Sequence, residues 1–265
     1  MLTSTRNPWI KTLRQLHQVK GRRQQQCFLI EGTHLLQEAI ATSWPLAAAC
    51  FTPEWLERHE STLARVPGTV RQQVVSPAVL DALATTQTPD GVVAVAKRQN
   101  AVGADENIDL AIALETVSDP GNAGAIVRTA VAAGADRVWL SADSVDPDHP
   151  KVLRASAGQW FRSPPYAVQS LPELIQRCRD RHIQVFAAAT APANKPAQVL
   201  WQLDFTQPTL FLLGNEGAGL SQELIQLADT CVQIPMQAGV ESLNVAIAGA
   251  ILLYEARRQR QTVQQ

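Results

Sequence analysis

The sequence predicts an α/β protein with two domains, the second built on a parallel sheet that is covered by helices on both faces. Short apolar runs alternate with helical patterns from residue 110 onward, as in parallel strands joined by helices. Of the 265 residues, 46% are hydrophobic and 18% are charged, so the chain can bury a core. A polar stretch without periodicity, residues 98–108, is the predicted linker between domains 1–97 and 109–265.

The N-terminal domain is predicted to be a small α/β unit. Thr33 can cap a helix whose following apolar residues recur at helical spacing. A second, short helix is expected around Pro77–Ala84. The predicted strands are Phe28–Ile30, Leu46–Phe51, Val74–Val75 and Val92–Ala96.

The C-terminal domain is predicted from alternating strands and helices. Its last helix, about Leu243–Arg257, is apolar on nearly every side, which indicates burial in the core or against another subunit. The predicted strands are Leu110–Leu114, Arg137–Leu140, Gln184–Ala189, Thr209–Leu213 and Cys231–Ile234; the other predicted helices are Gly124–Gly134, Leu171–Arg181 and Leu220–Ala228.

The formal charge of −1 is unevenly distributed along the chain. The first 23 residues contain no acid, and the first 97 carry a net positive charge. Such a start can bind phosphates, or it can be a solvated helix face; charge alone leaves both open. The basic residues in this stretch are Arg6, Lys11, Arg14, Lys20, Arg22 and Arg23.

The sequence also limits where the protein can act and whether it holds a metal. The basic start imitates a mitochondrial transit peptide, but Pro8 and the lack of a Ser-rich stretch argue against one. No secretory signal and no apolar run long enough to span a bilayer is found, so a cytoplasmic protein without a membrane partner is expected. The four cysteines are widely scattered, which predicts reduced thiols and no metal site.

Three segments carry candidate chemistry. The first, Ser118–Ala130, follows a strand with a turn signal and places Arg128 on the next helix, near the sheet edge where α/β ligand sites form. For Arg128 alone, a surface salt bridge is the favoured interpretation.

The second segment, Gly214–Ser221, is a glycine-rich loop between a strand and a helix. Its glycines permit positive φ and close approach of a ligand. It comes within one residue of a phosphate-binding P-loop, but Leu220 stands where that motif needs Lys, and Glu216 would repel a triphosphate. A cationic or hydroxyl-bearing ligand suits the carboxylate better; a plain strand–helix turn is the alternative.

The third segment, Ile234–Ala250, runs from a strand through a loop into the apolar last helix. Ser242 or Glu241 is the expected cap of that helix, and capping is also the alternative role of Asn244. Because this loop and the glycine loop both follow strands and face the same sheet edge, together they could enclose a flat ligand.

These segments resemble the three motifs of the SpoU (TrmH) family in the SPOUT superfamily, S-adenosyl-methionine-dependent RNA ribose 2'-O-methyltransferases. The matching patterns are Asp119-Pro-x-Asn122-x-Gly-x-x-x-Arg128, then Gly214-x-Glu216-Gly-x-Gly219, then Ile234-Pro-Met followed by Ser242-Leu-Asn244. Residues 28–40 resemble the family's N-terminal RNA-binding domain, and residues 149–161 a further family segment. The family's usual Gly two residues after Met is Ala238 here, with Gly239 next.

The resemblance implies a deep trefoil knot near the C-terminus, a homodimer, and no metal. It further implies that polar chemistry rests on Arg128, Asn122, Glu216, Ser242 and Asn244. The cofactor would be held, largely through backbone groups, by Gly214, Ile234 and Leu243, with Leu213, Gly217 and Met236 beside them. RNA would be held by Arg6, Lys11, Arg22 and Arg23.

The implied chemistry is an in-line attack of a ribose 2'-hydroxyl on the methyl group of the sulfonium. Arg128 has a side-chain pKa above about 12, so a role in holding the ribose and its phosphate is preferred over that of a neutral base. The extra N-terminal domain favours ribosomal RNA over tRNA. A tRNA 2'-O-methyltransferase and a non-catalytic RNA-binding module of the same fold remain as alternatives, and a P-loop NTPase is made poor by Leu220.

Overall fold

The structure, a computed structural model, describes residues 1–99, 108–189 and 196–263. Its elements form two compact units: Met1–Asn100 with Asp148–Arg162, and Ala101–Pro147 with Ser163–Gln265. Most of the predicted linker, residues 100–107, lies outside the described residues. The predicted limits of 1–97 and 109–265 differ from this division at residues 148–162, which pack with the N-terminal unit.

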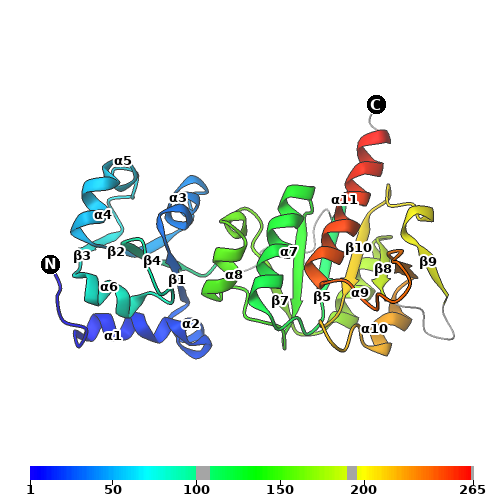
Figure 1. The fold of residues 1–265 in the computed structure, drawn as a ribbon, viewed down its shortest axis with the longest axis horizontal. Coiled ribbons are helices and arrows are strands. Elements are labelled where there is room, and N and C mark those ends of the chain that lie inside the picture. Colours follow the sequence, from blue (N-terminus) through cyan, green and yellow to red (C-terminus); the bar gives the residue numbers. More distant parts are fainter. Residues whose placement is uncertain (100–107, 190–195, 264–265) are drawn as a thin grey trace. The chain divides into compact units, whose positions relative to one another are not determined.

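The N-terminal unit is built on a four-stranded sheet of order β1-β4-β2-β3 (Figure 1). β4 pairs antiparallel with both β1 and β2, whereas β2 and β3 are parallel. The strands are β1 (Cys27–Glu31), β2 (Leu46–Phe51), β3 (Arg71–Val74) and β4 (Val92–Lys97). The helices are α1 (Pro8–Arg14), α2 (Val19–Gln25), α3 (Thr33–Ala41), α4 (Pro53–Arg58), α5 (Glu60–Leu63) and α6 (Pro77–Leu83), with a 3-10 turn at Gln15–His17.

The start of α3 corrects one prediction. Thr33 is the first residue of the helix, and Gly32 occupies the cap position. The backbone N–H of Thr33 donates instead to the carboxylate of Asp90, at 2.8 Å, and the Thr33 hydroxyl accepts from the indole of Trp55 at 2.7 Å. A distant acid therefore supplies the contact that the sequence assigned to a local hydroxyl.

Residues 148–162 complete the N-terminal unit with α8 (Pro150–Ala155) and a 3-10 turn at Gln159–Phe161. The ring of Trp160 lies 5.1 Å from those of Phe28 and Trp44, so the segment joins an aromatic cluster on β1. Such ring pairs stabilise a fold by about 0.5–1.5 kcal/mol each beyond their area burial. The segment is thus part of this unit's core.

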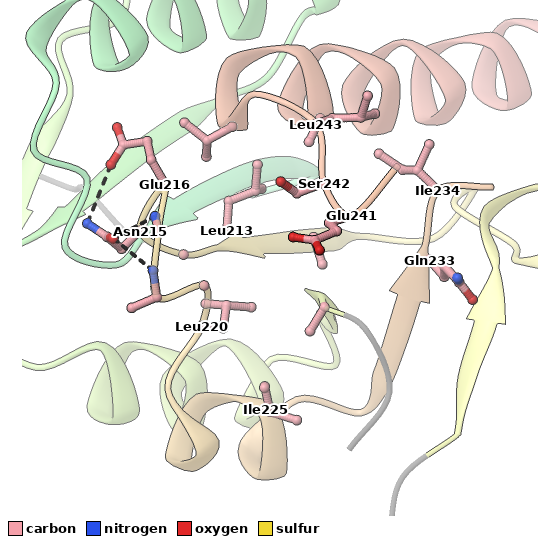
Figure 2. Close-up of a pocket in the computed structure, with 18 of the residues that line it drawn as sticks. Leu213, Asn215, Glu216, Leu220, Ile225, Gln233, Ile234, Glu241, Ser242 and Leu243 are labelled. Atoms are coloured by element: carbon pink, nitrogen blue, oxygen red, sulfur yellow. Dashed lines mark hydrogen bonds between the residues drawn. The ribbon is translucent and has the colours of Figure 1, made fainter. Parts of the chain in front are cut away.

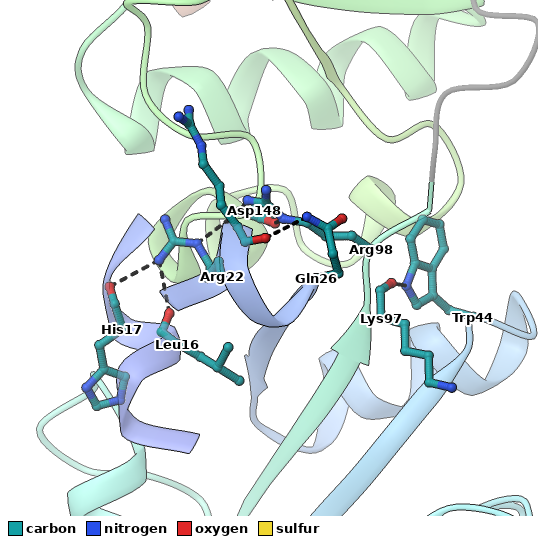
Figure 3. A network of polar contacts seen from close by, with 9 residues as sticks. Leu16, His17, Arg22, Gln26, Trp44, Lys97, Arg98 and Asp148 are labelled. Atoms are coloured by element: carbon teal, nitrogen blue, oxygen red, sulfur yellow. Dashed lines mark hydrogen bonds and ion pairs between the residues drawn. The ribbon is translucent and has the colours of Figure 1, made fainter. Parts of the chain in front are cut away.

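A buried ion network fixes the beginning of this segment (Figure 3). The side chain of Arg22 is fully buried; its Nε donates to Asp148 at 2.9 Å, and a terminal nitrogen donates to the carbonyls of Leu16 and His17, both at 3.1 Å. Arg98 donates to both oxygens of the same carboxylate. A buried guanidinium is tolerated only when paired and hydrogen-bonded, and here it is both.

The C-terminal unit is built on a seven-stranded sheet of order β7-β6-β5-β10-β8-β11-β9, with parallel pairing between each pair of neighbours (Figure 1). The strands are β5 (Leu110–Leu114), β6 (Arg137–Ser141), β7 (Tyr166–Val168), β8 (Gln184–Ala188), β9 (Ala197–Val199), β10 (Thr209–Leu213) and β11 (Thr230–Gln233). The helices are α7 (Pro120–Ala133), α9 (Leu171–Asp180), α10 (Gln222–Leu227) and α11 (Val245–Val263), with a 3-10 turn at Leu200–Gln202.

Helices cover both faces of this sheet, as predicted. Ala111 and Ala113 of β5 pack in one core with α9 and α10. On the other face α7 packs against α11, and Ile112 approaches Gly249 of α11. Successive residues of β5 point to opposite faces of the sheet, because side chains alternate along a strand. Since both faces are covered by helices, β5 is an unbroken apolar run.

The last helix differs from its prediction in its bounds and in the burial of one face. It begins at Val245, and one of its faces is open in the single chain: Ile247 and Tyr254 are 54% and 50% exposed. Burial in the core alone is therefore excluded for this face. Within the described part of the chain, no helix is long and apolar enough to cross a membrane.

Candidate active site

A pocket of about 400 Å³ lies at the carboxyl ends of β8, β10 and β11. The loop after β10 and the loop between β11 and α11 enclose it together, with apolar side chains lining its interior (Figure 2). Because parallel strands end at the same edge, loops far apart in the sequence meet here. All six residues predicted to hold the cofactor line this pocket: Leu213, Gly214, Gly217, Ile234, Met236 and Leu243.

The glycine loop is closed on itself by two backbone hydrogen bonds. Asn215 N donates to Gly219 O and Gly219 N donates to Asn215 O, both at 3.0 Å. A Cβ at Gly214 would lie 2.1 Å from the carbonyl carbon of Gly219, so only glycine permits this approach. Of the three loop glycines, which were expected to permit positive φ or a close approach, Gly219 has a positive φ of +70° and Gly214 makes the close approach.

A chain of polar side chains joins the three predicted motifs. Asn244 Nδ2 donates to Asn122 Oδ1 at 3.0 Å, and Asn122 Nδ2 donates to Glu216 Oε1 at 3.0 Å. The three residues come from α11's start, α7's first turn and the glycine loop, so each motif contributes one member. The tertiary structure thus brings into contact side chains that are up to 122 residues apart in the sequence.

The charge state of Glu216 follows from these contacts. Burial raises the pKa of this carboxyl, but the hydrogen bond from Asn122 and bonds from the backbone of Glu216, Asp119 and Ser118 outweigh burial and leave the pKa lowered. Glu216 is therefore an anion at neutral pH, placed at the lip of the pocket.

Asn244, and not Ser242 or Glu241, caps α11. Its Oδ1 accepts from the backbone N–H of Ala246 at 2.9 Å and of Ile247 at 3.3 Å. Ser242 and Glu241 are thereby left to line the pocket as exposed side chains.

Arg128 is not brought to the pocket of its own chain. It lies on the exposed side of α7, outside the pocket lining and outside the Asn122 network, and its side chain makes no hydrogen bond or ion pair to another described residue. The surface salt bridge favoured from its sequence context is therefore absent within the described part of the chain.

The predicted RNA-binding set divides by exposure. Arg6, Lys11 and Arg23 are exposed, as a phosphate contact requires. Arg22 is fully buried, and its guanidinium is bonded to Asp148 and to two backbone carbonyls. It therefore cannot contact an RNA phosphate, and its predicted RNA-binding role is wrong. The basic run did not indicate the burial of Arg22, because the carboxylate that pairs with Arg22 lies 126 residues away in the sequence.

Sequence reasoning missed several residues of the pocket. Asn215 lines it and joins two loops, and Glu241 adds a second carboxylate. The end of β8 contributes Ala188 and Ala189. Ala188 and Ala189 could have been predicted to line the pocket, because they lie at the carboxyl end of a parallel strand. Nothing in the sequence indicates the side-chain contacts of Asn215.

Metal and thiol chemistry find no support. Among the described residues, no group of three or more His, Cys, Asp or Glu side chains could hold a metal ion. The four cysteines form no disulfide, and burial raises the pKa of the Cys50 thiol to about 12, so that thiol stays protonated.

The comparison with known families decides the class. The model of the SpoU rRNA Methylase family matches residues 109–254, more than half of the chain, and that of the MRM3-like substrate binding domain matches residues 7–94. The chain belongs to the SpoU rRNA methylase family. The predicted family and enzyme class, an RNA methyltransferase, are thereby confirmed.

Relatives of this SpoU methylase match it along nearly its whole length. A tRNA/rRNA methyltransferase of Synechocystis is 45% identical, covering 98% of this chain and 94% of the relative. The 23S rRNA (guanosine(2553)-2'-O)-methyltransferase RlmP of Bacillus subtilis is 32% identical, covering 97% and 98%. The SpoU methyltransferase AviRb of Streptomyces viridochromogenes, solved with AdoMet, superposes with a TM-score of 0.85 at 29% identity, covering 97% and 99%.

Proposed function

We propose that this SpoU methylase transfers a methyl group from S-adenosyl-methionine to a ribose 2'-hydroxyl of ribosomal RNA. The observation that carries the proposal is the Asn244–Asn122–Glu216 chain at the lip of a pocket of cofactor size. Relatives that match nearly the whole chain act on 23S rRNA at the 2'-oxygen.

The pocket fits the proposed cofactor by size and charge. Its volume of about 400 Å³ lies in the range of small-molecule sites, about 300–1,000 Å³. Glu216 and Glu241 are carboxylates at its lining, which suit a ligand carrying sulfonium and ammonium charges. Leu213, Ile234 and Leu243 would hold the flat apolar part of the ligand.

When bound, S-adenosyl-methionine supplies a methyl group on sulfur, which is already a good leaving group. The protein's own task is then to position the ribose hydroxyl and exclude competing water; such positioning can contribute about 7–11 kcal/mol in good cases. Glu216, held as an anion by Asn122, can accept the hydroxyl's hydrogen bond, and Ser242 offers a second polar contact. Arg128 does not reach the pocket of its own chain, so in the proposed homodimer it would act at the pocket of the other copy, where its planar fork grips the ribose and its phosphate.

Four further assignments belong to this proposal. The open apolar face of α11, with Ile247 and Tyr254 about half exposed, supports a homodimer that covers it. The two loops enclosing one pocket are consistent with a trefoil knot between β10 and α11. We also propose that the enzyme needs no metal and acts in the cytoplasm.

Ribosomal RNA is preferred over tRNA because an N-terminal domain of the substrate-binding type spans residues 7–94. The exposed Arg6, Lys11 and Arg23 of this unit are the proposed phosphate contacts. Mapping 2'-O-methyl positions in RNA from cells with and without the protein separates the two substrates. A site found only in tRNA would refute the ribosomal assignment.

The catalytic assignment is tested by Arg128→Lys in single-turnover methylation with cofactor and RNA saturating. The change keeps the charge and removes the fork, so we expect a rate loss of about 100-fold or more, roughly 2.7 kcal/mol in the barrier. Arg179→Lys is the matched control, since Arg179 makes only a partly exposed ion pair with Asp229, at 3.3 Å. A near-parental rate for Arg128→Lys would refute its catalytic role.

A non-catalytic RNA-binding module of the same fold is tested separately. The presence of all five polar motif residues argues against it. Transfer of labelled methyl groups from S-adenosyl-methionine to total RNA decides the matter, and its complete absence in the purified protein would favour the module.

A further inference from the structure

The loop between β5 and α7 contains a strained residue. Thr116 has φ = +53°, in the left-handed region that β-branched residues rarely adopt. Such a conformation is unfavourable and persists only where surrounding contacts enforce it. Thr116 lies just before the Ser118–Asp119 turn that leads into α7, so its backbone sets the direction of that turn.

Three contacts enforce this conformation. Thr116 N donates to Ser141 Oγ at 2.8 Å, and its hydroxyl donates to Asp143 Oδ2 at 2.8 Å. Its carbonyl oxygen accepts from Asn215 Nδ2, also at 2.8 Å. Two of the contacts come from the end of β6 and the loop after it, but the third comes from the glycine loop beside the pocket.

The same Asn215 side chain also shapes the glycine loop. Its Oδ1 accepts from the backbone N–H of Gly217 at 2.9 Å and of Ala218 at 3.0 Å (Figure 2). Because β5 and β10 are parallel neighbours, with Leu114 opposite Leu213, one amide at the end of β10 can reach the loop after β5. The Asn215 side chain thus accepts within its own loop, whereas its amide nitrogen donates to the Thr116 carbonyl of the other loop and, at a longer 3.4 Å, to Glu216 Oε2.

We propose that Asn215 is a positioning residue for methyl transfer, because its amide ties the glycine loop to the strained Thr116 turn. The inference rests on the site assigned under the proposed function. Glu216 follows Asn215 directly, and Asn122 follows the Thr116 turn. Together with the bonds from Glu115 N to Leu213 O and from Ser221 N to Glu115 Oε2, the tie holds the two loops across which Asn122 donates to Glu216 at 3.0 Å.

The residue type is specific for this role. Asp would keep the acceptor contacts to Gly217 and Ala218 but would lose the donor to Thr116. Ser would also keep an acceptor near the loop, but beyond Cβ its side chain has one heavy atom where Asn has three, so it falls short of the Thr116 carbonyl. Each substitution therefore keeps an acceptor for the glycine loop and removes the hydrogen bond that connects this loop to Thr116.

The test compares Asn215→Ser with the parent in two measurements. Cofactor affinity by calorimetry should stay within about threefold, since the loop keeps an acceptor and threefold is only about 0.65 kcal/mol. The single-turnover rate with both ligands saturating should fall about tenfold or more, because a displacement on the order of 1 Å can cost about 100-fold. A purely structural role would lower thermal stability and leave the saturated rate unchanged.

Two controls make the outcome specific. Asn7→Ser changes another asparagine with the same local contact, Oδ1 accepting from Trp9 N two residues on at 2.9 Å, and should leave the saturated rate at the parental value. Glu216→Gln tests the site itself: if it leaves the rate parental, the proposed site fails. If it lowers the rate while Asn215→Ser does not, only the positioning role of Asn215 fails.

Asn215→Asp provides a second variant in case the serine variant does not fold. It keeps the size of the side chain and both acceptor contacts, and it should show the same loss of saturated rate. Because it adds a charge beside Glu216, a loss seen in Asp but not in a folded Ser variant would overturn the proposal. A rate loss in Ser that higher cofactor concentration restores would also overturn it.

Discussion

Replacing Gly214 by Ala should strongly weaken cofactor binding while leaving the rest of the fold intact. The added Cβ would meet the Gly219 carbonyl carbon at 2.1 Å, the Gly219 oxygen at 2.2 Å and the Leu220 nitrogen at 2.2 Å. All three atoms are backbone, so no side chain can rotate away. The glycine loop must open instead.

The structure sets the size of the effect. Ordinary contact begins near 3.4 Å, so the backbone at Gly219 must move by about 1.3 Å. That movement strains both hydrogen bonds that close the loop between Asn215 and Gly219, each worth about 0.5–1.5 kcal/mol. Overpacking adds about 1–3 kcal/mol. Together these contributions amount to about 2–6 kcal/mol, so we expect cofactor affinity to fall by at least about 2 kcal/mol, which is roughly 30-fold.

Calorimetry with S-adenosyl-methionine measures this loss, and circular dichroism verifies that the variant is folded. Gly219→Ala should weaken binding less than Gly214→Ala, because Gly219 has a positive φ but open space around its Cβ direction. Gly68→Ala, where a Cβ meets no atom within 4 Å, is the control and should bind as the parent does. Parental affinity in a folded Gly214→Ala protein would refute the close-approach argument.

Three other outcomes are expected. Asp148→Ala leaves the fully buried Arg22 without its carboxylate and should lower the free energy of unfolding by about 3–5 kcal/mol in denaturant titrations; unchanged stability would contradict the buried pair. Changing Lys11 and Arg23 together to Gln should flatten the salt dependence of RNA binding by roughly 0.7–0.9 per lost contact, with cofactor affinity unaffected; an unaltered slope would remove both from the RNA surface. Ile247→Glu should convert the proposed dimer to monomers in light scattering, whereas a parental protein that is already an active monomer would refute the dimer.

Local patterns in the sequence were sufficient for five of the seven strands in the sheet of the C-terminal unit. β5 and β10 are buried on both faces, and such strands read as continuous apolar runs between turn residues. The short edge strands β7 and β9, three residues each, were not predicted because so short a run carries no periodicity.

The location of the candidate site was also largely predictable. Glycine and polar motifs directly follow strands, and parallel strands bring their carboxyl ends to one edge. The six predicted cofactor residues consequently line one pocket, and three of the five predicted polar residues form one hydrogen-bond chain. Their catalytic and binding roles stay predictions.

The pairing of side chains was decided by the tertiary structure alone. In the sequence Arg22 is one cation in a basic run; its burial depends on Asp148, which a segment far along the chain carries into the N-terminal unit. Asn215 is likewise an ordinary loop residue until the neighbouring strand β5 places the Thr116 carbonyl within reach of its amide. Apolar periodicity records which residues are buried, whereas a hydrogen bond depends on the position of two particular atoms, and only the folded chain fixes both.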